Sequence, residues 1–194
     1  PLMQEFIDTF GGISDLRRKR IRTVGNPDTR FKEDALRMLR LIRFMALLGF
    51  KPNKQTINAI QPRLMRNIAQ ERIKDELSKL LVAKKIIYPL QLMYTSGIMK
   101  EILPELANCA GIEQGSYHRW DVLNHSIKSA QVIKEDLVLR LAALLHDIGK
   151  TETKTQDAKG VHFYGHDKIG ATMAGQVLSR LTYSKRIQAQ VSLL

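Results

Sequence analysis

Apolar residues recur at helical spacing along most of this 194-residue chain. The strongest pattern covers residues 29–48, where Leu36, Leu39, Phe44 and Leu48 roughly follow one helix face and Gly49 supplies a stop. The same spacing, with Gly and Pro as breakers, predicts further helices at residues 54–61, 68–83, 86–95, 98–103, 121–134, 136–147, 168–182 and 184–194. Short strands are expected only before Gly25, at residues 6–7 and 21–24. The chain is therefore predicted to be mainly α.

Composition narrows the class of protein. Hydrophobic residues make up 44% and charged residues 26%, which is ordinary for a folded globular chain and excludes long disorder. No stretch approaches the roughly 18 uncharged apolar residues of a membrane span, so no membrane partner is expected. Because its single cysteine, Cys109, cannot form an internal disulfide, a reducing, cytoplasmic location is expected.

Positive charge is concentrated in the first half of the chain. Residues 1–100 hold 20 Lys/Arg against 9 Asp/Glu, whereas residues 101–194 hold 11 against 10. A formal net charge of +12 indicates a polyanionic partner, above all nucleic acid, although a merely soluble basic protein is the alternative. The densest basic run spans residues 17–22, and phosphate contact and plain solvation are equally good interpretations of it.

A first group of charged residues lies on the helix predicted at residues 29–48. At 100° per residue, Glu33, Arg37 and Arg40 fall on one face with Asp34 at its edge. One interpretation is a solvated face with a Glu33–Arg37 pair. The other is base recognition, because a carboxylate offers acceptors and a guanidinium offers a fork of donors.

A second group contains nitrogen and oxygen ligands. His146-Asp147 follows an apolar helix, with His125 21 residues before His146 and His166 19 residues after Asp147. This mixture suits Mn²⁺, Ni²⁺, Co²⁺ or Zn²⁺. The alternative is a core cluster that binds no metal.

Three ordered motifs resemble bacterial-type CCA-adding tRNA nucleotidyltransferases and the related poly(A) polymerases. The block at residues 7–16 with 21–25, the Glu33-Asp34-x-x-Arg37 segment, and Glu71-Arg72-Ile73 with Glu76-Leu77 follow that family's order. The resemblance implies that Asp34 and Arg37 read the base of CTP or ATP, with Glu33 and Arg40 in support. It also implies tRNA or another RNA as partner and Mg²⁺ for nucleotidyl transfer in the parent enzyme.

The sequence departs from that family in one respect. It contains no D-x-D pair, so the catalytic head is expected to lie upstream of Pro1 and no residue of this chain is expected to catalyse transfer. The C-terminal part of the chain resembles an HD domain. Because poly(A) polymerases generally lack an HD domain, this resemblance favours CCA addition.

The segment from Asp121 onward resembles the HD phosphohydrolase superfamily, most closely the HD domain attached to many CCA-adding enzymes. The resemblance implies that His125, His146 and Asp147, with His166, hold a metal ion that activates water for attack on phosphorus, and that Lys150 contacts phosphate. The expected organisation is the end of the head at 1–25, helical neck and body at 26–104, and an all-α HD domain, truncated at its C-terminus, at 105–194.

Two further hypotheses remain open. The chain could be a stand-alone HD-type phosphohydrolase acting on nucleotides, or a non-catalytic RNA-binding helical module. The sequence leaves the oligomeric state undetermined.

Overall fold

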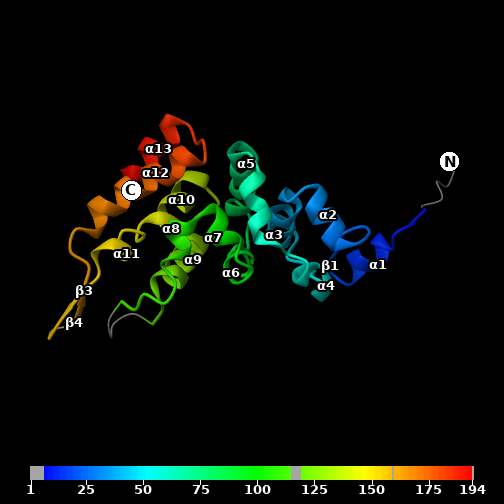
Figure 1. Cartoon of the computed structure of the whole chain (residues 1–194), viewed down its shortest axis with the longest axis horizontal. Coiled ribbons are helices and arrows are strands. Elements are labelled where there is room, and N and C mark those ends of the chain that lie inside the picture. The colour runs from blue at the N-terminus through cyan, green and yellow to red at the C-terminus, as the bar shows by residue number, and fades with distance from the viewer. Residues whose placement is uncertain (1–6, 115–118, 159, 194) are drawn as a thin grey trace.

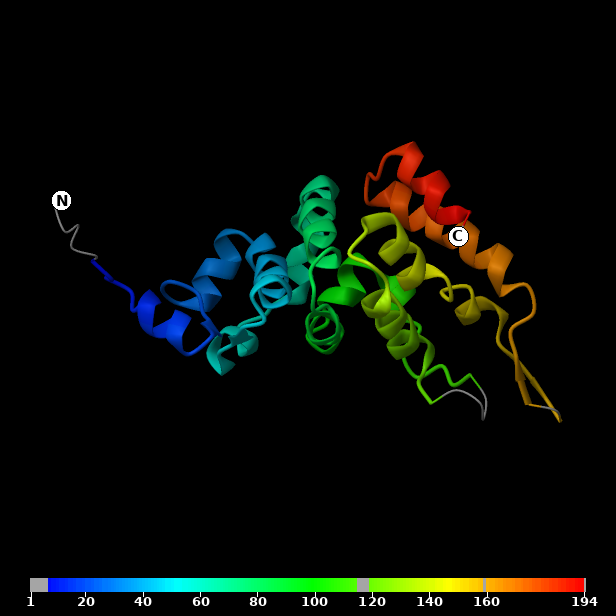
Figure 2. The same cartoon turned by 180° about the vertical axis from the view of Figure 1, so that it is seen from behind.

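The computed structural model describes residues 7–114, 119–158 and 160–193, and it forms an elongated, mainly helical molecule (Figure 1). The N-terminal helix α1 lies at one end and α9–α13 lie at the other, as the reverse view also shows (Figure 2). The elements in chain order are α1 Gly12–Arg17, β1 Arg20–Ile21, α2 Pro27–Glu33, α3 Leu36–Leu48, β2 Lys51–Pro52, α4 Lys54–Asn58, the 3₁₀ helix η1 Pro62–Asn67, α5 Gln70–Leu81, α6 Ile87–Thr95, α7 Ile98–Ile102, α8 Pro104–Ala107, α9 Val122–Val132, α10 Leu137–Leu145, α11 Lys150–Thr153, β3 Thr155–Asp157, β4 Gly160–His162, α12 His166–Arg180 and α13 Lys185–Ser192.

The predicted mainly helical class is confirmed, and each predicted helix beyond residue 50 has a counterpart. Among the described residues, no helix is long and apolar enough to cross a membrane. Of the strand predicted at residues 6–7, residue 6 lies outside the described residues and Ile7 is not in a strand. The strand predicted at 21–24 is the shorter β1, which pairs in parallel with β2.

The single helix predicted at residues 29–48 is wrong. The structure has two helices, α2 and α3, because the backbone of Asp34 is extended, with φ −150° and ψ 100°. The Asp34 carboxylate accepts the Leu36 N–H at 3.2 Å, so its side chain competes with the helical hydrogen bonds of the backbone. The four charged residues placed on one continuous face therefore lie around a junction between two helices.

A second difference is the antiparallel hairpin formed by β3 and β4 within the region predicted to be all-α. It projects beyond the helices in Figure 1. Each strand has three residues, which is too short for an alternating pattern to emerge from the sequence.

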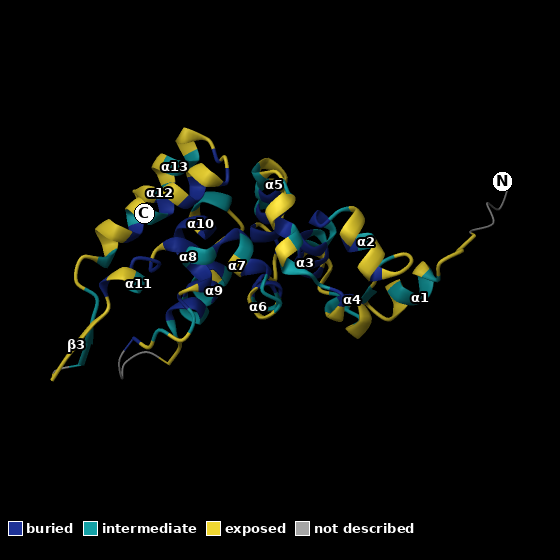
Figure 3. Ribbon diagram, in the orientation of Figure 1, coloured by how far each residue is buried: buried dark blue, intermediate teal, exposed yellow. Residues whose placement is uncertain are grey.

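One hydrophobic core runs through most of the molecule, from Phe31 on α2 to Val191 on α13. Figure 3 shows buried residues from α3 through α12, whereas α1 has none. The domain boundaries placed at residues 25/26 and 104/105 stay a prediction. The continuous core means that the neck helices and the helices of the last third stabilise one another.

Arg140 of α10 joins those two parts and is only 1% exposed. Its guanidinium donates to the carbonyl oxygens of Leu81, the last residue of α5, and Ala83, and to that of Ile133. Nearby, the hydroxyls of Ser78 and Tyr183 lie 2.9 Å apart, and burial raises the pKa of Tyr183 to about 12. A buried guanidinium that satisfies three carbonyls links α5, α9 and α10 at their ends.

Replacing Arg140 with leucine leaves the two buried carbonyls of Leu81 and Ala83 and the part-buried carbonyl of Ile133 without their donor. We expect Arg140→Leu to lower the free energy of unfolding by about 3 kcal/mol or more, since each unsatisfied buried group costs about 1–3 kcal/mol. Chemical denaturation measures the difference, with the exposed Lys134→Leu as the matched control. A loss below about 1 kcal/mol relative to that control would contradict the assigned role of Arg140.

Candidate functional site

The junction between α2 and α3 is organised around Asp34. Its Oδ1 accepts the Leu36 N–H, and its Oδ2 accepts from Arg72 Nη2 of α5 at 3.0 Å. Arg40 Nη1 lies 3.9 Å from the same Oδ2. The Asp34 carboxylate is thus held in one orientation at the surface of the neck.

Arg37 lies beside Asp34 but has different partners. Its Nη1 donates to Glu33 Oε2 at 2.7 Å and to the carbonyl oxygen of Arg30 at 2.8 Å. The hydrogen bond from Arg37, together with the charge of Arg30, lowers the pKa of Glu33. The Glu33–Arg37 pair therefore forms although the helix is interrupted between them. The structure brings Asp34 and Arg37 to one junction without a direct contact between their side chains among the described residues.

Glu76 on α5 anchors the far side of this junction. It is 5% exposed and lies between two arginines of α3, with Arg40 Nε 3.2 Å from Oε1 and Arg43 Nε 2.6 Å from Oε2. Arg40 thus has the supporting position expected of it. Sequence reasoning assigned no role to Arg72 or Glu76, although a glutamate within the apolar face of α5 was a detectable signal.

The second group gathers around Asp147, which is 3% exposed. Its Oδ2 lies 3.2 Å from His146 Nε2 and 3.8 Å from His125 Nε2, and its Oδ1 lies 3.7 Å from His166 Nε2. One ligand atom from each of His125, His146 and Asp147 lies within 4.8 Å of the others. The fourth predicted ligand, His166, approaches the opposite carboxylate oxygen.

Backbone carbonyls orient two of these imidazoles. His146 Nδ1 lies 2.9 Å from the carbonyl oxygen of Ala143, and His166 Nδ1 lies 2.7 Å from that of Phe163. Because a carbonyl only accepts, Nδ1 carries a proton in each hydrogen bond, so Nε2, beside Asp147, is the atom that can lose its proton and bind a cation. Such outer hydrogen bonds are typical of metal-ligating histidines. The donor set therefore fits a divalent cation.

In this structure Lys150 forms an ion pair with the carboxylate of Asp147. Its Nζ donates to Asp147 Oδ2 and to Gln114 Oε1, both at 2.7 Å, and its side chain is only 11% exposed. The phosphate contact predicted for Lys150 remains a prediction, since these two acceptors hold its ammonium inside the cluster. Sequence reasoning missed Gln114, for which no motif gave a signal.

Gly149 allows α12 to approach the cluster. A Cβ at Gly149 would lie 2.2 Å from the carbonyl oxygen of His166 and 2.6 Å from the Gly170 nitrogen, so any larger residue would clash with backbone. The missing side chain brings the start of α12, and with it His166, against the turn that carries Asp147.

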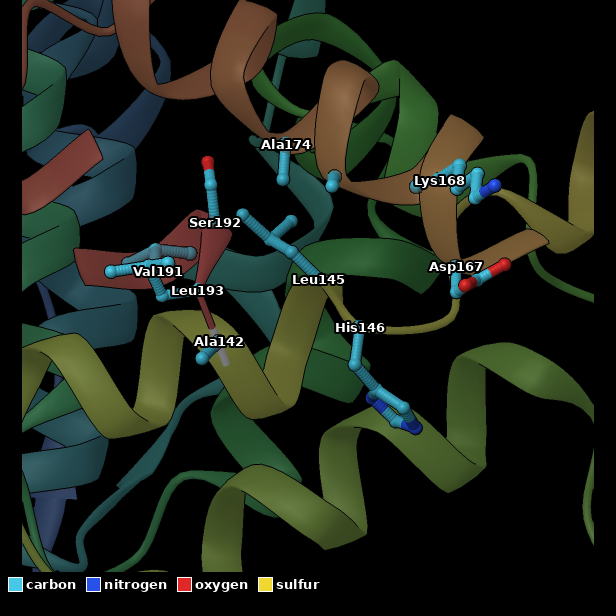
Figure 4. A pocket seen from close by; sticks show the side chains of 11 residues that line it. Ala142, Leu145, His146, Asp167, Lys168, Ala174, Val191, Ser192 and Leu193 are labelled. Carbon is cyan, nitrogen blue, oxygen red and sulfur yellow. The ribbon is translucent and has the colours of Figure 1, made fainter. Parts of the chain in front are cut away.

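An apolar hollow of 340 Å³ lies beside the cluster, between α10, α12 and α13. Figure 4 shows the His146 imidazole directed away from Leu145 and Ala174, two of the side chains that line it. His146 thus lines the hollow while its imidazole turns toward the cluster.

Electrostatics favour an ionised carboxylate at the centre of the cluster. Burial alone would raise the pKa of Asp147, but hydrogen bonds from His146 and Lys150 outweigh burial and hold it well below its ordinary value. Burial likewise disfavours the charged form of His146, yet its hydrogen bond to Asp147 raises the pKa of His146 above the ordinary 6.5. The Asp147 carboxylate therefore favours the protonated form of His146, and Lys150 compensates the same charge at 2.7 Å.

Known proteins resemble this chain along most of its length. Residues 49–109 match the family described as "Probable RNA and SrmB- binding site of polymerase A", and residues 115–193 match the HD domain. An A-adding tRNA nucleotidyltransferase of Deinococcus radiodurans is 33% identical over 92% of this chain and 44% of its own length. The CC-adding tRNA nucleotidyltransferase of Thermus thermophilus is 32% identical over 94% of this chain and 45% of its own length.

The chain belongs to the family of CCA-adding enzymes and poly(A) polymerases.

Within that family, the chain spans less than half the length of these two relatives. A solved structure of a tRNA-processing enzyme covers 96% of the chain and 46% of its own length with a TM-score of 0.60. Its 21% identity supports the shared fold alone. The HD-domain match includes all four predicted ligands, so the match and the cluster agree in indicating a divalent metal site.

Metal binding to His146 Nε2 requires the imidazole to be neutral, so protons compete with the metal. Because the pKa of His146 is raised, this competition reaches above pH 6.5. We expect Mn²⁺ affinity, measured by calorimetry from pH 5.5 to 8.5, to weaken at least about tenfold per pH unit below a midpoint that exceeds 6.5.

His162→Ala serves as the control, since His162 pairs with Asp157 on the hairpin and not with Asp147. A midpoint at or below 6.5, or equal loss of Mn²⁺ binding in His162→Ala, would contradict the assignment.

Proposed function

We propose that this chain is the nucleotide-selecting neck and the HD part of a tRNA nucleotidyltransferase that adds CCA to tRNA 3′ ends from CTP and ATP. The observation that carries the proposal is the interlocking of two family motifs. Asp34 pairs with Arg72, and Arg40 pairs with Glu76. Helix α5, which bears the motif at residues 71–77, therefore holds the residues of the motif at residues 33–37 and Arg40 in place. Head residues that hold Mg²⁺ would belong to the rest of the enzyme.

The chemistry of the junction suits the bases of CTP and ATP. Both bases present an amino donor next to a ring-nitrogen acceptor on the pairing edge, which matches a carboxylate beside a guanidinium. Uracil and guanine instead present a carbonyl acceptor next to a ring N–H donor on the pairing edge. Among the described residues, Arg37 makes its side-chain hydrogen bonds through Nη1, which leaves Nη2 and Nε for a base.

Nucleotide selection tests these roles in the full-length gene product. We expect Asp34→Ala and Arg37→Ala to reduce incorporation of CMP and AMP into tRNA that lacks CCA by about 10- to 100-fold, because a two-bond base contact contributes about 1–3 kcal/mol. Lys32→Ala is the control, since Lys32 is exposed on α2 and forms no ion pair among the described residues. Steady-state incorporation of each nucleotide gives the measurement.

Two results would contradict the proposal. One is unchanged selection in both Asp34→Ala and Arg37→Ala. The other is a gene whose reading frame starts at Pro1, because such a gene could not encode the metal-binding carboxylates that transfer requires.

A second activity is favoured by the cluster around Asp147. We propose that His125, His146, Asp147 and His166 hold Mn²⁺, Ni²⁺, Co²⁺ or Zn²⁺, for which mixed imidazole and carboxylate ligands are suited. A bound cation supplies Lewis acidity toward a phosphate ester and water. Asp147 stays ionised, the carbonyls of Ala143 and Phe163 fix two imidazoles, and Lys150 orients Asp147. The residues suit hydrolysis of a phosphate ester on a nucleotide or RNA end.

Phosphate release measures this second activity. With Mn²⁺ or Ni²⁺ added, we expect hydrolysis of nucleoside monophosphates or cyclic nucleotides that falls at least about 100-fold in His146→Ala and stays unchanged in the control His162→Ala. Hydrolysis that persists in His146→Ala would exclude the cluster as its site. Tight RNA binding with no turnover at any metal would instead favour the non-catalytic RNA-binding module.

A further inference from the structure

The basic half of the chain uses most of its arginines in ion pairs. Five acidic residues each hold one or two of them, namely Asp15 with Arg20 and Arg22, Glu33 with Arg30 and Arg37, Asp34 with Arg72, Glu76 with Arg40 and Arg43, and Glu101 with Arg66. These pairs compensate part of the positive charge of this half, with five carboxylates against eight guanidinium groups. The remaining charge excess of this half lies elsewhere.

Much of it lies at the end of the molecule formed by α1, β1 and β2. Arg17, Arg18, Lys19, Lys51 and Lys54 are exposed, and none forms an ion pair among the described residues. Three of them meet at one hollow of 390 Å³ whose lining is Arg18, Lys19, Arg20, Gly49, Lys51 and Pro52. We call this feature the cationic hollow. Of the residues that the structure describes, no carboxylate lines it, and the nearest acidic partner is Asp15, which pairs with Arg20.

The backbone brings these cations together from two distant segments. β1 and β2 pair in parallel with Arg20 opposite Lys51, and the Lys51 N–H donates to the Lys19 carbonyl oxygen at 3.0 Å. Lys19 itself has φ 50°, a left-handed conformation that is uncommon for a residue with a side chain. Like charges are thus held side by side by strand pairing. Asp15 compensates the charge of Arg20, and no other ion pair within this group is found among the described residues.

The position of the hollow relates it to the nucleotide-selecting junction. β2 follows the C-terminal end of α3, whereas Arg37 lies in the first turn of α3. A helix of 13 residues is about 20 Å long, so the hollow and the junction are separated by about that distance. At roughly 3.4 Å per nucleotide, the value for a strand of double-stranded DNA, this distance corresponds to several nucleotides. A nucleic-acid strand whose 3′ end reaches Asp34 can therefore extend its backbone from the junction to the cationic hollow.

We propose that the cationic hollow binds the phosphodiester backbone of RNA whose 3′ end lies at the α2–α3 junction. The inference rests on the proposed function for RNA as the partner, and it adds the residues that hold the strand. Arg18, Lys19 and Lys51 contact phosphates without reading sequence. Arg17 and Lys54 extend the same positive surface beyond the hollow.

Charge reversal tests the hollow directly. The variant carrying Arg18→Glu, Lys19→Glu and Lys51→Glu is compared with one carrying Lys134→Glu, Lys185→Glu and Arg186→Glu, which makes the same charge change on exposed residues of the other half. The probe is a fluorescent acceptor-stem hairpin RNA with a single-stranded 3′ end. Anisotropy is recorded between 50 and 200 mM NaCl, and circular dichroism confirms that both variants fold.

We expect the hollow variant to bind at least about tenfold more weakly at 100 mM NaCl and to lose about 2–3 units of slope in log affinity against log salt, since each phosphate contact contributes about 0.7–0.9. The control should stay within about threefold of the unmodified chain. Equal losses in both variants, or an unchanged hollow variant, would overturn the site and leave the proposed function standing. Failure of the unmodified chain to bind the hairpin at 50 mM NaCl would overturn the inference together with the RNA partner of the proposed function.

Discussion

A buried negative charge at Asp147 organises the second half of the molecule. A carboxylate that is 3% exposed must be compensated, and its compensating groups come from separate segments of the chain. His125 comes from α9, His146 from the end of α10, Lys150 from α11 and His166 from the start of α12. The absence of a side chain at Gly149 lets α12 come close enough. The same charge therefore holds the helices together and assembles the ligand atoms.

In the neck, too, acidic side chains are compensated by charged groups from separate helices, but these groups are arginines. Glu76 is buried between Arg40 and Arg43, and Asp34 is held by Arg72, so α3 and α5 are fixed to each other by charge as well as by apolar packing. Histidines surround the acid at one site, which suits metal binding, whereas arginines surround the acids at the other, which suits recognition of a base. Arg140 links the two parts through the backbone carbonyls at and just after the end of α5.

The helices could be predicted from the sequence because apolar spacing and the breakers act locally. The break at Asp34 could not, since it depends on an aspartate whose carboxylate accepts the Leu36 N–H and also pairs with Arg72, 38 residues away. The metal cluster could be proposed from His-Asp and two distant histidines. The role of Gln114 depends on a contact between distant segments that no local pattern predicts, whereas Glu76 stands out as a glutamate on the apolar face of α5 although its arginine partners do not follow from the sequence. The β3–β4 hairpin was missed because its strands are short and its first strand is fully exposed.

The central claim is that Asp147 and the imidazoles around it form one metal site. Anomalous diffraction from crystals grown with Mn²⁺ tests it most directly. The account predicts one strong peak within about 2.0–2.4 Å of His125 Nε2, His146 Nε2 and an Asp147 carboxylate oxygen, with Lys150 displaced from or sharing that carboxylate. A structure at full Mn²⁺ occupancy elsewhere, with Asp147 still held only by Lys150 and the histidines, would contradict it.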